Sequence, residues 1–189
     1  ASDWYDLRWL ALTSDPETAN AELAARLSPG PLGGETQKES GISRKVRLLV
    51  LGAMNIPRQF LVFLETCGAR IVAEDSEADE RTFTDDIPLD SRSPIEALAT
   101  AYLNKPPGPR PNALACRLAN ITRLLDERCV QGVIAYYPKF ADAYLAEYIQ
   151  LAELFRARGL PVLLLEDDGE SGFSGQQRTR VEAFLEVLA

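Results

Sequence analysis

The stretch Val46-Arg47-Leu48-Leu49-Val50-Leu51-Gly52 decides the fold class of this chain. A nearly continuous apolar run that ends at a glycine is typical of a parallel strand that is buried on both faces. Further predicted strands follow at 70–73, 132–136 and 161–165, with helical segments between them. This alternation predicts a parallel sheet with right-handed crossovers. We therefore expect an α/β fold, a three-layer α/β/α sandwich with a four-stranded parallel sheet of the flavodoxin or Rossmann type.

The predicted helices divide the chain into two regions. In the region with strands, apolar residues at helical spacing predict helices over 57–67, 94–103, 112–128, 143–158 and 176–188. Before it, residues 2–28 read as two helical pieces, and Asp15 with Pro16 predicts where the second begins. The Gly- and Pro-rich segment up to Lys45 predicts a linker. We thus expect a helical arm with linker, 1–45, and one α/β domain, 46–189.

The composition excludes several classes of function. The chain has 189 residues and a net charge of −8, with scattered Lys and Arg, which disfavours nucleic-acid binding. No apolar run approaches the roughly 18 residues needed to span a bilayer, so we expect no membrane insertion. The chain contains no histidine, which removes Ser-His-Asp and Cys-His catalysis and every His-containing metal site.

The three cysteines, Cys67, Cys116 and Cys129, contain no C-x-x-C pair. We interpret them as free thiols of a reducing compartment and expect a cytoplasmic protein. Free cysteines are usually small core residues, and a shared metal site needs three or four converging ligands. We therefore predict no metal on these thiols.

A ligand site of an open parallel sheet lies beyond the carboxyl ends of its strands. Four predicted loops meet at that edge, over 52–55, 74–90, 137–142 and 166–175. The second and fourth loops are strongly acidic, which suits a hard divalent cation, but their spacing matches no EF-hand, and we predict no metal. The first loop is not G-x-G-x-x-G, which disfavours a dinucleotide. The candidate ligand-binding residues in these loops are Asn55, Tyr137, Lys139, Asp142, Ser171, Gln176 and Arg180.

Several of these candidates also have a structural interpretation. Lys139 beside aromatic residues can be a ligand clamp, or it can reach solvent or an acidic neighbour. The start of the last helix can hold an anion, or Ser174 and Gln177 can form a capping box there. Arg180 can bind a ligand or pair with a carboxylate of the acidic loops. The sequence leaves these alternatives open.

Three segments in this order resemble the closing part of subunits of the 2-hydroxyglutaryl-CoA dehydratase and benzoyl-CoA reductase family: Val133–Phe140, Pro161–Asp168 and Gly175–Glu186. Earlier, Cys67–Val72 with Asp75 and Arg81 resembles the family segment that carries Asp-Asp-x-Cys-x-Gly-x-Arg. The stretch Pro94–Leu103, followed by Pro106 and Pro107, matches another segment. The resemblance covers 46–188, the C-terminal α/β domain of such a subunit.

The resemblance implies a heterodimeric enzyme with Fe–S clusters held by cysteine thiolates. It also implies an electron from an ATP-driven activator, which forms a radical on a CoA thioester and permits dehydration or ring reduction. This chain departs from the pattern, because Glu77, Gly108 and Ala141 stand where the family has cysteines. A carboxylate and a methyl group do not replace soft thiolate ligands of iron.

We therefore predict that the chain itself holds no cofactor, although the family uses a 4Fe–4S cluster. The first hypothesis is a cluster-free relative that acts as a binding or assembly subunit. Its expected partner is a homologous or cysteine-bearing subunit, or a second copy, and its expected ligand is an acyl-CoA. The alternative is part of an active acyl-CoA dehydratase or benzoyl-CoA-type reductase whose cluster is held by other domains or partner chains. Whether the chain is an enzyme stays open.

Overall fold

The structure is a computed structural model that describes residues 2–26, 45–53, 56–77, 87, 93–105, 113–168 and 173–189. It divides into two compact units, 1–44 and 45–189. In the first unit, α1 (Ser2–Thr13) and α2 (Pro16–Arg26) bury Leu7 and Ala19. The backbone N–H of Thr18 donates to Asp15 Oδ1 at 2.9 Å, which confirms the predicted helix start at Asp15 and Pro16.

The second unit contains a four-stranded, all-parallel sheet, which confirms the predicted fold class. Its strands are β1 (Val46–Gly52), β2 (Ala69–Asp75), β3 (Gly132–Pro138) and β4 (Val162–Asp167), in the order β2-β1-β3-β4. Neighbouring strands in the sheet are all parallel, so a helical crossover connects each strand to the next one in the chain. The strand order reverses between β1 and β3, where open α/β sheets place their ligands.

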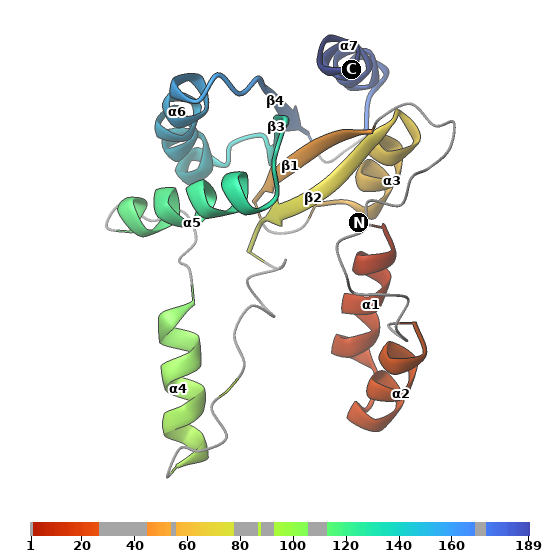
Figure 1. Cartoon of the computed structure of the whole chain (residues 1–189), viewed down its shortest axis with the longest axis vertical. Coiled ribbons are helices and arrows are strands. Elements are labelled where there is room, and N and C mark those ends of the chain that lie inside the picture. Colours follow the sequence, from red (N-terminus) through yellow and green to blue (C-terminus); the bar gives the residue numbers. More distant parts are fainter. Residues whose placement is uncertain are drawn as a thin grey trace. The chain divides into compact units, whose positions relative to one another are not determined.

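Helices cover both faces of this sheet (Figure 1). Helices α5 (Leu114–Glu127) and α6 (Asp142–Ala157) lie on one face, and α3 (Arg58–Thr66) and α7 (Gly175–Leu188) lie on the other. A further helix, α4, spans Pro94–Asn104. Within the described ranges, no helix is long and apolar enough to cross a membrane.

Alternate residues of the strands form two separate cores. On one face, Leu49, Val133 and Ala135 belong to a buried cluster with residues of α5 and α6. On the other face, Tyr136 of β3 stacks on Phe60 of α3, with ring centroids 4.4 Å apart. Because both faces are covered, the strands are apolar almost throughout, as the first strand predicted.

The second strand extends beyond the predicted end at Ala73. Glu74 and Asp75 pair with Val50 and Leu51 of β1, and they are only 8% and 1% exposed. The prediction that the acidic loop begins at Glu74 was therefore wrong. Two adjacent carboxylates usually indicate a loop, but here a buried arginine compensates one of them, as the next section describes.

Candidate functional site

The carboxyl ends of β1 and β2 are joined tightly. The backbone N–H of Glu77 donates to the carbonyl oxygen of Ala53 at 3.0 Å. A Cβ atom on Gly52 would lie 2.4 Å from Cγ1 of Ile56 and 3.3 Å from Cβ of Ser76. The end of β1 therefore favours glycine, because any other residue would displace the Ile56 side chain.

The ends of β3 and β4 form the second half of this edge. The Lys139 N–H donates to the carbonyl oxygen of Asp167 at 2.7 Å, and Lys139 Nζ lies 3.7 Å from Asp168 Oδ2. Both side chains of this ion pair are about half exposed. The next residue, Phe140, has a left-handed φ of 66° and is 90% exposed. The turn after β3 thus presents a cation and a strained aromatic residue to solvent.

Beneath this edge, on the face covered by α5 and α6, lies a buried ionic cluster. Arg117 of α5 is 1% exposed, and its Nη2 lies 2.8 Å from Asp75 Oδ2 at the end of β2. Its Nε donates to Glu147 Oε2 of α6 at 2.6 Å. One guanidinium therefore connects the last residue of an edge strand to both helices on that face.

The charges of this cluster determine its protonation. Burial alone would lower the pKa of Arg117. The carboxylates of Asp75 and Glu147 together raise this pKa by more than burial lowers it, so the net shift is upward. Arg117 therefore stays charged.

Tyr137 lies beside the cluster, and two tyrosines of α6 pack against its ring. Tyr137 of β3 is fully buried, and its ring lies against those of Tyr144 and Tyr148 of α6. Its hydroxyl has no hydrogen-bond partner among the residues that the structure describes. Burial raises the pKa of this hydroxyl; the charge of Arg117 opposes the shift, and Asp75 and Glu147 add to it.

The opposite face of the same strand ends is aromatic. Tyr136 stacks on Phe60, and Phe173, just before α7, packs edge-on against Phe60 at 5.1 Å. The guanidinium of Arg178 lies 4.8 Å from the ring centroid of Phe63 and 4.9 Å from that of Phe173. These are cation–π distances, so Arg178 is held by aromatic rings, and no ion pair is needed to explain its position.

The predicted ligand-binding residues fall into separate environments. Asn55 and Ser171 lie outside the described residues. The Tyr137 side chain is in the core, whereas Lys139, Asp142 and Gln176 are exposed near the carboxyl edge. Arg180 Nη2 donates to the carbonyl oxygen of Leu164 at 2.9 Å.

The last helix begins with the predicted capping box. The Gln177 N–H donates to Ser174 Oγ at 3.3 Å, and the Ser174 N–H donates to Gln177 Oε1 at 2.7 Å. The structural interpretation of this segment is thus confirmed. The reciprocal bonds satisfy two backbone donors at the start of α7.

Sequence reasoning missed Arg117 and Glu147. A signal was present in the helical periodicity, since Arg117 occupies the same buried face of α5 as Ile121 and Leu124. In the same way, Glu147 shares the buried face of α6 with Leu151. A charged residue at a core position of an amphipathic helix needs a buried partner, and two such residues on neighbouring helices indicate each other.

The positions where the family resemblance expects cysteines converge in part. Tyr144 connects two of them, because its N–H donates to the carbonyl oxygen of Ala141 at 2.9 Å and its hydroxyl lies 3.1 Å from Glu77 Oε1. The third, Gly108, lies outside the described residues. The side chains at Glu77 and Ala141 are a carboxylate and a methyl group, which do not fit an Fe–S cluster.

The cysteines of the chain lie elsewhere. Cys67 caps α3 and Cys129 follows α5, so both precede strands and lie at the amino end of the sheet. Cys116 and Cys129 are exposed, so the interpretation of these two as core residues was wrong. In the described ranges, no three His, Cys, Asp or Glu side chains converge on one point.

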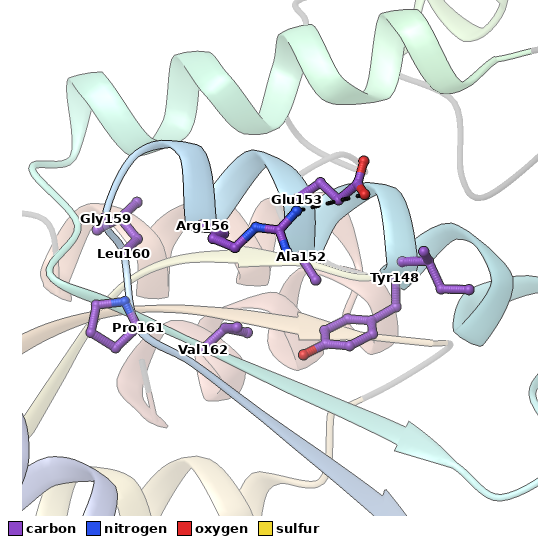
Figure 2. A pocket seen from close by; sticks show the side chains of 9 residues that line it. Tyr148, Ala152, Glu153, Arg156, Gly159, Leu160, Pro161 and Val162 are labelled. Atoms are coloured by element: carbon purple, nitrogen blue, oxygen red, sulfur yellow. Dashed lines mark ion pairs between the residues drawn. The ribbon is translucent and has the colours of Figure 1, made fainter.

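A surface hollow of about 730 Å³ lies away from this edge, between α6 and the amino end of β4 (Figure 2). Tyr148, Pro161 and Val162 contribute to its apolar lining, and Arg156 and Glu153 form an ion pair of 3.7 Å at its rim. None of the predicted ligand-binding residues that the structure describes lines it.

Comparison with known proteins identifies the family to which the chain is similar. A family model described as "2-hydroxyglutaryl-CoA dehydratase, D-component" matches residues 3–188. The (R)-phenyllactyl-CoA dehydratase beta subunit of Clostridium sporogenes is 27% identical over 142 residues. That alignment covers 75% of this chain but only 38% of the relative. The family match begins at residue 3 and so includes the helical arm, which the resemblance from Val46 onward left out.

Proposed function

Because the chain belongs to the 2-hydroxyglutaryl-CoA dehydratase D-component family, we propose that it is a cluster-free member that acts as a binding or assembly subunit. The observation that carries the proposal is the chemistry of the side chains at the two described positions where cysteines are expected, both of which are hydrogen-bonded to Tyr144. At these positions, the Glu77 carboxylate accepts a hydrogen bond from Tyr144, and Ala141 has only a methyl group. Neither side chain supplies sulfur for iron.

The buried cluster next to these positions supports the same proposal. Arg117 ties β2 to α5 and α6 through Asp75 and Glu147. These contacts join the carboxyl end of β2 to both helices on that face. Such a scaffold supports a fixed binding surface at this edge.

The partner that we propose is a homologous, cysteine-bearing dehydratase subunit in the cytoplasm. The relative named above is a beta subunit, which implies a second kind of subunit in that protein. A second copy of this chain is the other candidate partner. Three free cysteines in the sequence suit a reducing compartment.

The ligand that we propose is an acyl-CoA at the carboxyl edge of the sheet. Lys139, Asp142 and Gln176 are exposed there, and Lys139 is the cation best placed to meet a phosphate. Thermal-shift titration with acyl-CoAs tests this part. Lys139→Ala should abolish the shift, whereas Arg123→Ala, which removes an exposed arginine of α5, should retain it.

The decisive experiment is anaerobic iron and sulfide analysis of the purified chain, before and after cluster reconstitution. We expect no stoichiometric iron or sulfide in either sample. The matched control replaces Cys67, Cys116 and Cys129 by serine and should give the same background. Stoichiometric 4Fe–4S absorption that this triple variant loses would overturn the proposal and favour the active-enzyme alternative.

Co-purification separates the two roles further. Expression with a cysteine-bearing homologous subunit should give a complex whose iron content resides in that subunit alone. If the complex dehydrates an acyl-CoA and Lys139→Ala abolishes turnover without releasing the partner, this chain contributes directly to catalysis. A complex whose turnover survives that substitution supports an assembly role.

A further inference from the structure

Strand β4 lies at one edge of the described sheet and carries an apolar sequence. Its neighbour is β3 alone, and it reads Val162-Leu163-Leu164-Leu165-Glu166-Asp167. Unprotected edge strands of this composition can add a strand from another molecule, because their outer N–H and C=O groups are available. The protein therefore needs a device that closes this edge.

The pairing of β3 with β4 identifies which groups face outward. The N–H of Val133 donates to the carbonyl oxygen of Pro161, and that of Lys139 donates to Asp167. Odd-numbered residues of β4 thus face β3. Because successive residues of a strand point their backbone groups to opposite sides, the carbonyl oxygens of Leu164 and Glu166 lie on the outer edge.

Two of the outward-facing carbonyls of β4, those of Leu164 and Glu166, are occupied by side chains of α7. Arg180 Nη2 donates to the carbonyl oxygen of Leu164 at 2.9 Å. Gln177 Nε2 donates to that of Glu166 at 2.7 Å. The two donors are three residues apart on one face of the helix, and the two acceptors are two residues apart on one side of the strand. Helix α7 therefore runs back along the edge with its donors in register.

From these contacts we infer that Arg180 and Gln177 close the outer edge of β4 against strand addition by a second copy of this chain. Each donor satisfies an acceptor that an incoming strand would use. Gln177 has two roles, since its Oε1 accepts from Ser174 N–H in the capping box while its Nε2 reaches Glu166.

The test compares Arg180→Ala with Arg178→Ala by sedimentation velocity over a series of protein concentrations. The two changes remove the same charge from the same helix, but Arg178 lies over Phe63 and Phe173 and not on the edge. Arg180→Ala should strengthen self-association by about tenfold or more over the unmodified chain. Arg178→Ala should leave it unchanged.

Hydrogen exchange locates the new contact. In Arg180→Ala, amide protection over 162–166 should rise with protein concentration, as expected of a paired edge. If Arg180→Ala associates no more than Arg178→Ala, the inference is wrong. Association without added protection over 162–166 contradicts it equally, since another surface would then be responsible.

A second pair of variants keeps the test valid if Arg180→Ala fails to fold. Gln177→Glu retains the acceptor that caps α7 but removes the donor to Glu166. Arg180→Lys retains one donor and the charge. The Gln177→Glu, Arg180→Lys double variant should associate more strongly than Arg180→Lys alone, and equal association of the two overturns the inference.

Discussion

The two faces of the sheet differ most at the end of β3, where adjacent tyrosines point to opposite sides. Tyr137 faces α5 and α6 and lies beside the buried ionic cluster of Arg117. Tyr136 faces α3 and stacks on Phe60 in an aromatic cluster. The two adjacent tyrosines of β3 thus belong to different cores. One core contains a buried ionic cluster, and the other contains stacked aromatic rings.

The two cores should differ in how much stability the protein loses when one side chain is replaced. The aromatic face gains most of its stability from burial of apolar area, and a smaller apolar residue loses only part of it. The ionic face has one cation between two carboxylates, so removal of the cation takes away the positive charge that two buried carboxylates share. We expect the ionic face to be the less tolerant of substitution.

The largest effect should come from Arg117→Met, which keeps much of the side-chain volume and removes the charge. It should lower the free energy of unfolding by about 3–5 kcal/mol, measured by urea denaturation at pH 7. Arg123→Met on the same helix removes an exposed i,i+4 ion pair with Glu127 and should cost only about 0.5 kcal/mol. Equal effects of the two changes would show that the buried pair contributes no more than a surface pair.

A compensated variant sharpens the same comparison. Arg117→Met combined with Asp75→Leu and Glu147→Leu replaces the whole cluster by apolar residues of similar size. It should recover most of the lost stability, because no buried charge remains uncompensated. A triple variant that is less stable than Arg117→Met would mean that the carboxylates stabilise the fold through other contacts.

Alkaline pH should destabilise both faces through their tyrosines. Burial raises the pKa of Tyr137, and burial together with the hydrogen bond to Asp167 raises that of Tyr136. A raised pKa in the folded state means that the unfolded chain releases its protons first, above the ordinary value of 10.0. Stability should be constant below that pH and then fall by about 1.4 kcal/mol per pH unit for each tyrosine.

Urea denaturation between pH 8 and 11 measures this dependence. Each of Tyr136→Phe and Tyr137→Phe should remove about 1.4 kcal/mol per pH unit from the slope above the ordinary tyrosine pKa, and Tyr148, whose pKa burial also raises, should retain its own share. The exposed Tyr102 provides the control, because Tyr102→Phe should leave the slope unchanged. A slope larger than the share of Tyr148 in the double Tyr136→Phe, Tyr137→Phe variant would place the alkaline loss in other groups.

Phe60→Leu tests the tolerance of the aromatic face. Phe60 is 1% exposed and contacts both Tyr136 and Phe173, so the change removes two ring contacts but keeps an apolar side chain. We expect a loss of about 1 kcal/mol in the free energy of unfolding. A loss as large as that of Arg117→Met would show that the ring geometry, and not the buried area, stabilises this face.

The fold was predictable because it depends on local patterns. The apolar run from Val46 to Leu51 identified a buried strand, and Ser174 with Gln177 identified the start of the last helix. These signals lie within a few residues of one another. Such signals do not depend on contacts with distant parts of the chain.

The site was only partly predictable, because its central contacts join distant parts of the chain. Arg117 pairs with Asp75 and Glu147, which are far away in sequence. Without knowledge of this partner, a carboxylate at the end of a predicted strand indicates a loop. Arg180 was expected at a ligand or a carboxylate, whereas it donates to a backbone carbonyl. No side-chain pattern in a sequence marks a backbone acceptor on the edge of a sheet.

The smallest effect should come from Tyr137→Phe at pH 7, and it separates the adjacent tyrosines most directly. The Tyr136 hydroxyl donates to Asp167, so Tyr136→Phe should cost about 0.5–1.5 kcal/mol. The Tyr137 hydroxyl is buried without a hydrogen-bond partner in the described structure, so its removal should leave the free energy of unfolding unchanged or slightly raise it. Both changes delete one oxygen atom from a buried ring on the same strand. If Tyr137→Phe is the more costly of the two, the Tyr137 hydroxyl must be hydrogen-bonded in solution, and the ionic face extends to include β3.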